Sequence, residues 1–218
     1  VGSVSSRCSG MSPRTPRKTA GRVRLSFVYL DQSENRLPRS GRRNNYINYH
    51  TRINFKMANE SDLFDVACER DLEKFNLDNL KDLQKKAIKK LVYGQDVFVI
   101  QPTGSGKSLI FQAGPTVFDV MKPMKGKSIA IVISPLISLM QDQVMYLKSL
   151  GITAEFIGEE QDDDGAKNAV ERGECQLVYG SPEAFLSSKR WRNMISSKVY
   201  KERLCLIAVD EAHCVSHW

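Results

Sequence analysis

The sequence predicts an α/β fold in which helices flank a parallel sheet, and three observations carry that prediction. From residue 61 onward, short apolar runs alternate with segments of helical periodicity, the pattern of parallel strands joined by crossover helices. One apolar run, 96–100, opens directly into a glycine-rich turn, and another, 204–209, ends in two acidic residues. Ligands of open α/β sheets bind at the carboxyl edge, so both segments predict one site there.

The boundaries of the expected elements come from apolar periodicity and from residues that begin or end helices. A helix is expected over Leu80–Val92, with Asp78 or Asn79 as its cap and Gly94 at its end. A second clear helix is expected over 138–150. Strands are expected at about 96–100, 128–133, 154–157, 176–179 and 204–209.

The acidic segment 160–171 partly matches a calcium-binding EF-hand loop but lacks the frame of one. Asp162, Asp164 and Glu171 fall at loop positions of that motif, whereas Glu160 replaces its first Asp. A strand rather than a helix precedes the segment, so the ligands have no helix pair to hold them. We expect a solvated acidic loop.

Positive charge is concentrated in the first quarter of the chain. Residues 1–56 contain twelve Lys or Arg against two acidic residues, a net charge of +10, whereas the whole chain carries +7. The remainder therefore carries −3, so any DNA surface there has to be a local patch. Residues 23–30 are a candidate for a brief strand, but low apolar content and missing periodicity predict a disordered basic arm at 1–58, followed by a folded domain at 59–218.

Three interpretations of the basic arm stay open. Two Ser/Thr-Pro steps among basic residues suit nuclear import or proline-directed phosphorylation. An Arg- and Ser-rich, acid-poor segment equally suits an organellar transit peptide. Met57-Ala58 is also a candidate translation start, which would place the arm outside the translated protein. The chain begins at Val1 and ends at Trp218 inside a motif, so we expect a fragment at both ends.

The cysteines and the apolar runs indicate an intracellular protein. The five cysteines lack Cys-x-x-Cys spacing, and Cys205 lies inside an apolar strand, which is typical of reduced thiols. No run approaches the roughly 18 apolar residues of a membrane span, and no secretory signal is visible.

The segment Gln101-Pro-Thr-Gly-Ser-Gly-Lys-Ser108 has the composition of a loop that binds nucleoside triphosphates. Its glycines let the backbone approach phosphates, and the amides at the N-terminus of the following helix face the anion. We expect Lys107 to contact the β- and γ-phosphates and the Ser108 hydroxyl to ligate Mg²⁺. The strict pattern has Gly where this chain has Gln101, a position that helicase-type ATPases often relax. The other expected phosphate contacts are Thr103, Gly104, Ser105 and Gly106.

The second chemical centre is Asp210-Glu211, at the end of an apolar run that reads as a central strand. An Asp at this edge can hold Mg²⁺, and a Glu one residue on can orient and deprotonate the water that attacks the γ-phosphate. Acids at a strand end also occur for solubility alone. The phosphate loop upstream favours the catalytic interpretation.

Four ordered blocks resemble the RecQ family of DNA helicases over roughly residues 70–218. The C-terminal block from Asp210 resembles motif II of that family, running into its aromatic-rich loop. The other three blocks resemble the adenine-reading motif, motif Ia and motif Ib, at 75–84, 134–143 and 181–183. The resemblance implies a RecA-like P-loop ATPase lobe. A DEAD-box RNA helicase would instead show Asp-Glu-Ala-Asp at motif II.

The resemblance implies roles around the nucleotide. Gln84 would hydrogen-bond the adenine edge and select ATP, while Lys81 stands where the family more often has Arg, so stacking is weaker. Phe75 is a candidate for packing against adenine, with a place in the core as the alternative. His213 is implied to link the nucleotide site to the DNA side, although a lone histidine is otherwise a core residue.

The resemblance also implies a DNA-binding edge. Ser134, Pro135 and Ser138 flank a helix start, a natural site for a DNA phosphate, with plain helix capping as the alternative for the serines. Ser181 belongs to motif Ib, and Trp218 to a loop where stacking on a base contributes about 1–3 kcal/mol. The implied partner is single-stranded DNA, or duplex with a single-stranded tail, and no membrane.

The expected function is ATP-dependent DNA unwinding with 3′→5′ polarity, using ATP and Mg²⁺, with work in DNA repair and recombination in the nucleus. The resemblance implies a second RecA-like lobe with arginine fingers, which these residues lack. A finger is worth about 10³ to 10⁵ in phosphoryl-transfer rate, so we expect this lobe alone to bind Mg·ATP weakly and hydrolyse it poorly. The alternative is a non-motor ATP- and nucleic-acid-binding module, or an inactive truncated helicase.

Overall fold

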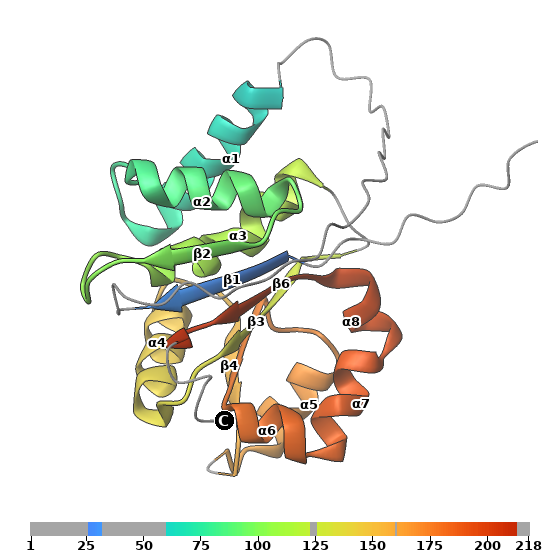
Figure 1. The fold of residues 1–218 in the computed structure, drawn as a ribbon. Coiled ribbons are helices and arrows are strands. Elements are labelled where there is room, and N and C mark those ends of the chain that lie inside the picture. The colour runs from blue at the N-terminus through green and yellow to red at the C-terminus, as the bar shows by residue number, and fades with distance from the viewer. Residues whose placement is uncertain (1–25, 32–59, 123–125, 160, 213–218) are drawn as a thin grey trace, which may run out of the picture.

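The computed structural model describes residues 26–31, 60–122, 126–159 and 161–212, which fold around one parallel sheet (Figure 1). The strand order is β2-β1-β6-β3-β5-β4, and every described pairing is parallel. Parallel strands require crossover connections, which the intervening helices supply. The strands are β1 (Ser26–Asp31), β2 (Val97–Ile100), β3 (Ile129–Ile133), β4 (Ala154–Ile157), β5 (Leu177–Gly180) and β6 (Leu204–Val209).

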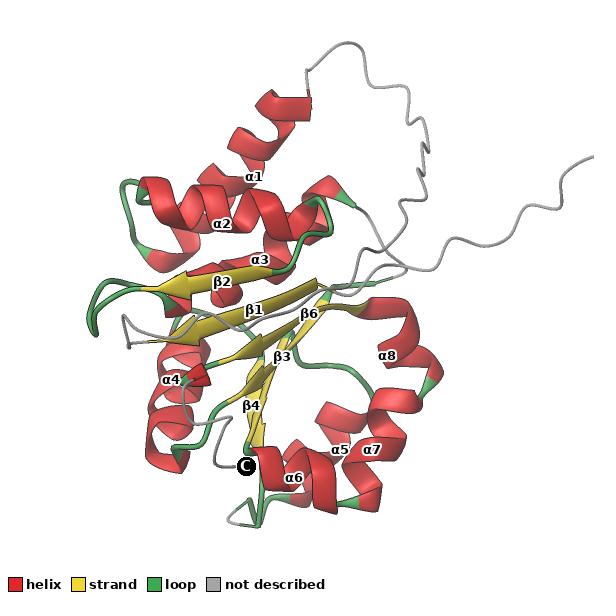
Figure 2. Cartoon of the chain, viewed as in Figure 1, coloured by secondary structure: helices red, strands yellow, loops and turns green. Residues whose placement is uncertain are grey.

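The helices form two layers, one on each face of the sheet (Figure 2). The first layer packs through the larger of two buried clusters and consists of α1 (Glu60–Phe75), α2 (Asp82–Val92), α3 (Ser108–Met121) and α4 (Ile137–Ser149). The second packs through the smaller cluster and consists of α5 (Asp164–Glu171), α6 (Pro182–Ser187), α7 (Lys189–Ser196) and α8 (Lys198–Arg203).

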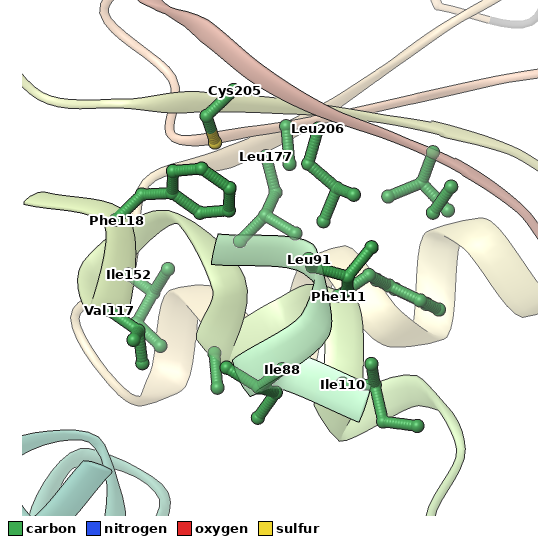
Figure 3. Close-up of a cluster of buried hydrophobic side chains, with 14 of the residues drawn as sticks. Ile88, Leu91, Ile110, Phe111, Val117, Phe118, Ile152, Leu177, Cys205 and Leu206 are labelled. Carbon is green, nitrogen blue, oxygen red and sulfur yellow. The ribbon is translucent and has the colours of Figure 1, made fainter. Parts of the chain in front are cut away.

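Alternation along the strands divides the core between these layers. In β3, Ala130 and Val132 belong to the cluster under α1–α4, whereas Ile129 and Ile131 belong to the cluster under α5–α8. Successive side chains of a strand point to opposite faces, so a strand buried on both faces is apolar throughout. Figure 3 shows the first cluster, where α2 and α3 place Leu91, Phe111 and Phe118 beneath the sheet.

The structure agrees with the expected strands to within one residue at each end. Helix α2 begins two residues later than expected, with Lys81 rather than Asp78 or Asn79 as its N-cap. The Gln84 side-chain oxygen accepts from the Lys81 backbone amide at 2.8 Å, which satisfies one otherwise unpaired donor at the helix start, whereas the Lys81 side chain makes no capping bond. Gly94 follows the helix with a φ of +77°, as expected for a glycine that ends a helix.

Strand β1 corrects one expectation, because it lies in the segment assigned to the disordered arm. It is placed between β2 and β6, with Tyr29 opposite Phe98 on one side and Val209 on the other. Pairing with strands far away in the sequence satisfies its backbone groups, an interaction that local composition does not reveal. The rest of the arm lies outside the described residues, and the domain boundary at 58/59 stays a prediction.

The acidic segment also differs from expectation, because 164–171 form helix α5 instead of a loop. The Asp163 carboxylate caps the helix by accepting a hydrogen bond of 2.7 Å from the Gly165 amide. Ala166 and Val170 are buried against the sheet side of this helix. The high acidic content of the segment thus marks a helix N-terminus and its exposed face.

Two compositional expectations can be compared with the described part of the chain. Cys68, Cys175 and Cys205 are buried thiols, and the reduced state expected for the cysteines stays a prediction. Burial raises the pKa of Cys175 to about 11, which keeps its thiol protonated and unreactive. None of the described helices is long and apolar enough to cross a membrane.

Candidate functional site

The phosphate loop connects the end of β2 to the start of α3, as the sequence predicts. Gly104 and Gly106 have φ values of +77° and +87°, which only glycine adopts without strain. A side chain at Gly106 would also collide with Gln84, since its Cβ would lie 2.7 Å from the amide nitrogen. The loop backbone therefore needs glycine at these two positions to open the helix N-terminus toward an anion.

Lys107 folds back over this loop. Its ammonium donates hydrogen bonds to the carbonyl oxygens of Gln101 (2.8 Å) and Pro102 (3.0 Å). These neutral acceptors hold the cation where phosphate oxygens, as anions, would be stronger partners. Ser108 begins α3 and is half-buried, and the Ser105 hydroxyl is buried without a partner among the described residues. The loop thus brings a cation and an unsatisfied hydroxyl to one helix N-terminus.

Lys81 and Gln84 hold the phosphate loop from α2. The Lys81 ammonium donates to the Ser105 carbonyl (2.8 Å), and the Gln84 amide donates to the Gly106 carbonyl (2.8 Å). The Gln84 side-chain oxygen also accepts from the Lys81 backbone amide, so both ends of this 5% exposed side chain are engaged. Contacts of these residues with adenine stay a prediction, and they require Gln84 to exchange at least one of these bonds.

Phe75 ends α1 in the hydrophobic core, where it is 4% exposed. Its place matches the core alternative that the sequence left open. Thr103 and Gly104 are exposed on the loop, where a ligand can reach them.

Asp210 and Glu211 follow β6 at the same edge of the sheet. Asp210 is 5% exposed, and its backbone amide donates to the Ile133 carbonyl at 2.8 Å. Burial raises the pKa of Asp210 to about 6, and the charge of Glu211 adds to the increase. The Glu211 amide, which donates to the Asp210 carboxylate at 3.1 Å, and the positive charge of Lys107 both lower that pKa. The phosphate loop and the acidic pair are therefore electrostatic neighbours.

Glu211 adopts a left-handed backbone conformation with a φ of 52°. Such a conformation costs a non-glycine residue roughly 1–2 kcal/mol and is concentrated at functional sites.

The residues at this edge fit a Mg²⁺ ion that is shared with a nucleotide. The described residues hold no group of three or more His, Cys, Asp or Glu that could cage a metal alone. Mg²⁺ is ordinarily held by one or two protein oxygens together with substrate phosphates and water. Asp210 supplies a buried carboxylate that a cation would stabilise in its ionised form, and Ser108 supplies a hydroxyl at the helix start.

The expected DNA-binding segments lie side by side because β3 and β5 are neighbours. Ile133 pairs with Gly180, and the Ser134 amide donates to the Gly180 carbonyl at 3.1 Å. Helix α4 has Leu136 as its N-cap with no side-chain capping bond, so neither Ser134 nor Ser138 caps it. The capping alternative is thereby wrong for both serines.

The individual serines differ in their access to a ligand. Ser138 is exposed and Pro135 half-buried, whereas Ser134 is 2% exposed and its hydroxyl lacks a partner in the described part of the chain. Ser181 caps α6 by accepting a hydrogen bond of 3.2 Å from the Ala184 amide. DNA contacts of these four residues stay a prediction, which the exposure of Ser138 supports best. His213 and Trp218 lie outside the described residues.

The sequence patterns did not predict a set of polar side chains beneath this edge, namely the buried Gln112 and Tyr179 and the half-buried Gln143. The available signal was a polar residue in an otherwise apolar helix, since Gln112 lies within the run from Leu109 to Val117.

Comparison with known proteins identifies the family to which the chain belongs. The pattern of the DEAD/DEAH box helicases matches residues 81–218, and the chain belongs to this family. It is 41% identical over 149 residues to ATP-dependent helicase SGS1 of Saccharomyces cerevisiae, covering 67% of this chain and 10% of that protein. It is 37% identical over 147 residues to ATP-dependent DNA helicase RecQ of Haemophilus influenzae, covering 66% and 22%.

A third relative extends the match within the chain. ATP-dependent DNA helicase Q-like 2 of Arabidopsis thaliana is 35% identical over 170 residues, which cover 74% of this chain and 23% of that protein. The chain therefore spans less than a quarter of the length of these relatives. The RecQ resemblance noted in the sequence is confirmed, and the matched region contains both the phosphate loop and the acidic pair.

Proposed function

We propose that this chain is the ATP- and DNA-binding first lobe of a RecQ-type, ATP-dependent DNA helicase. The observation that carries the proposal is that the phosphate loop follows β2 and Asp210 follows β6 at the same carboxyl edge of a parallel sheet, where the Lys107 charge lowers the pKa of Asp210. A phosphate loop and a buried acid at one edge are the two halves of a nucleoside-triphosphate site. The similarity to proteins named ATP-dependent DNA helicases supports ATP and DNA as the ligands of this lobe.

The chain's own residues have distinct tasks in this proposal. The loop amides and Lys107 bind the phosphates after Lys107 leaves the carbonyls of Gln101 and Pro102. Asp210 and Ser108 would hold Mg²⁺, which neutralises charge on the β- and γ-phosphates when bound. Glu211, one residue beyond Asp210, orients and deprotonates the attacking water.

The motor activity belongs to the complete protein in this proposal. A second lobe would supply arginine fingers, and closure of two lobes on ATP would move single-stranded DNA with 3′→5′ polarity. The exposed start of α4 and the turn before α6 are the proposed DNA contacts of this lobe. The basic arm and the eukaryotic relatives support a place in the nucleus.

The test is DNA-stimulated ATP hydrolysis by the longer protein that carries this lobe. Lys107→Ala removes the charge that meets the phosphates, and we expect the DNA-stimulated rate to fall by at least about 100-fold. Lys189→Ala, at an exposed position of α7 on the other face of the sheet, is the matched control and should leave the rate unchanged. Stimulated hydrolysis that survives Lys107→Ala would show that the site is assigned wrongly.

A further inference from the structure

A partly buried hydrogen bond joins α3, which begins at the phosphate loop, to α4, which begins at the proposed DNA edge. Gln112 lies one turn beyond Ser108 in α3 and is 7% exposed. Its amide donates to the side-chain oxygen of Gln143 in α4 at 3.3 Å. This bond joins side chains of the two helices in a region otherwise filled by apolar side chains.

Tyr179 reaches the same place from the sheet. It is fully buried, and its ring meets Phe111 of α3 edge to face, with centroids 6.3 Å apart and an interplanar angle of 71°. Its hydroxyl has no hydrogen-bond partner of good geometry among the described residues. Burial raises the pKa of Tyr179, the adjacent Gln112 amide lowers it, and the Asp210 charge raises it. The Tyr179 hydroxyl is therefore a buried donor beside the Gln112 amide of α3 and within the field of the Asp210 charge.

Gln112, Gln143 and Tyr179 can adopt two arrangements, one in which the Tyr179 hydroxyl has no partner and one in which it donates to Gln112. An amide side chain carries both a donor and an acceptor, so Gln112 can bridge Gln143 and the Tyr179 hydroxyl at the same time. A buried polar group without a partner costs free energy, which that second bond would recover. A small shift of α3 toward the sheet would close the bond. Phosphates and Mg²⁺ bound between the start of α3 and Asp210 would contact both of them. Such a ligand therefore favours the arrangement in which α3 lies closer to the sheet.

A shift of α3 would be transmitted to the proposed DNA edge through Tyr179 and Gln143. Tyr179 is followed directly by Gly180, whose carbonyl accepts from the Ser134 amide, and by Ser181. Gln143 lies in α4, which begins beside Ser138. We propose that Gln112, Gln143 and Tyr179 are positioning residues that couple nucleotide binding to single-stranded DNA binding in this lobe. The inference rests on the proposed function, and it assigns the coupling to residues outside both binding surfaces.

The coupling can be measured with the 218-residue chain itself. Fluorescence anisotropy gives the Kd for a labelled deoxythymidine oligonucleotide of about 15 nucleotides, without nucleotide and with saturating Mg²⁺ and a non-hydrolysable ATP analogue. The ratio of these two Kd values is the coupling factor, and we expect at least about fivefold in the wild type. Tyr179→Phe keeps the ring and removes the hydroxyl, and should bring the ratio to within about twofold of one.

A second buried tyrosine supplies the matched control. The Tyr200 hydroxyl donates to the Val170 carbonyl at 2.7 Å, in the layer on the opposite face of the sheet. Tyr200→Phe therefore removes a real hydrogen bond but should retain the wild-type coupling factor. Gln112→Met removes the amide at nearly the same volume and should reproduce the effect of Tyr179→Phe.

The outcomes separate the inference from the proposed function. A wild-type ratio near one, or a Tyr179→Phe chain with the wild-type ratio, would overturn the coupling role while leaving the binding sites intact. Equal loss of coupling in Tyr200→Phe would show a general effect of destabilisation and would also overturn it. A wild-type chain that binds no Mg·nucleotide would instead overturn the proposed function.

Discussion

Replacing Asp210 by Asn should stabilise the free chain while removing the carboxylate that is proposed to hold Mg²⁺. The folded state holds the carboxyl with a pKa of about 6, raised from 3.8 mainly by burial. A raised acid pKa means that ionisation opposes folding: the penalty is absent below the unfolded pKa and complete above the folded one. Two pKa units correspond to about 3 kcal/mol at neutral pH. The isosteric amide avoids this cost and can still accept from the Glu211 amide.

The pH dependence makes the magnitude testable by urea denaturation. The difference in unfolding free energy between Asp210→Asn and the wild type should be about 0.5 kcal/mol at pH 4, about 1.5 kcal/mol at pH 5 and about 3 kcal/mol at pH 7.5. Comparison with the wild type at each pH cancels the titration of all other groups. A variant that is less stable than the wild type, or a difference that does not grow with pH, would refute the burial argument.

Two further comparisons use matched pairs. Gly104→Ala and Gly106→Ala both place a side chain at positive φ, which costs about 1–2 kcal/mol. Only the Gly106→Ala side chain also collides with Gln84, so this variant should have the lower free energy of unfolding. Equal losses in chemical denaturation would contradict the close contact with Gln84. Tyr200→Phe should cost about 1 kcal/mol because its hydroxyl is hydrogen-bonded, whereas Tyr179→Phe should cost nothing or stabilise. The reverse order of melting temperatures would contradict the assignment of bonded and unbonded hydroxyls.

The sequence predicted the elements whose signals are local. The run before Gln101 and the run before Asp210 are apolar throughout and bounded by turn or charged residues, so both strands were found within one residue. For β1 the local signal was weak: residues 23–30 were a candidate strand in a polar, basic segment, and their pairing with strands that follow by more than 60 residues could not be predicted. Helix α5 was missed because acidity indicated solvent, although Asp163 acts as a cap and Val170 is buried.

The sequence predicted which residues form the candidate site better than it predicted the contacts between them. Glycine spacing fixed the phosphate loop, since positive φ at two defined positions admits few other residues. The clamp that Lys81 and Gln84 form on that loop was not predictable, because it depends on how α2 packs against the loop. The hydrogen bond between Gln112 and Gln143 could not be predicted either, because it joins residues 31 positions apart on different helices.

The most direct test of the central claim is calorimetric titration of the 218-residue chain with ATP, in the presence of Mg²⁺ and again with EDTA. The account predicts one site per chain, with affinity that depends on Mg²⁺ and falls about 10- to 100-fold in Lys107→Ala, the loss of one charge-assisted contact with phosphate. Lys189→Ala should bind like the wild type. If the affinity for ATP depends on neither Mg²⁺ nor Lys107, or if no binding is measured at any accessible concentration, the assignment of this edge as a nucleotide site is contradicted.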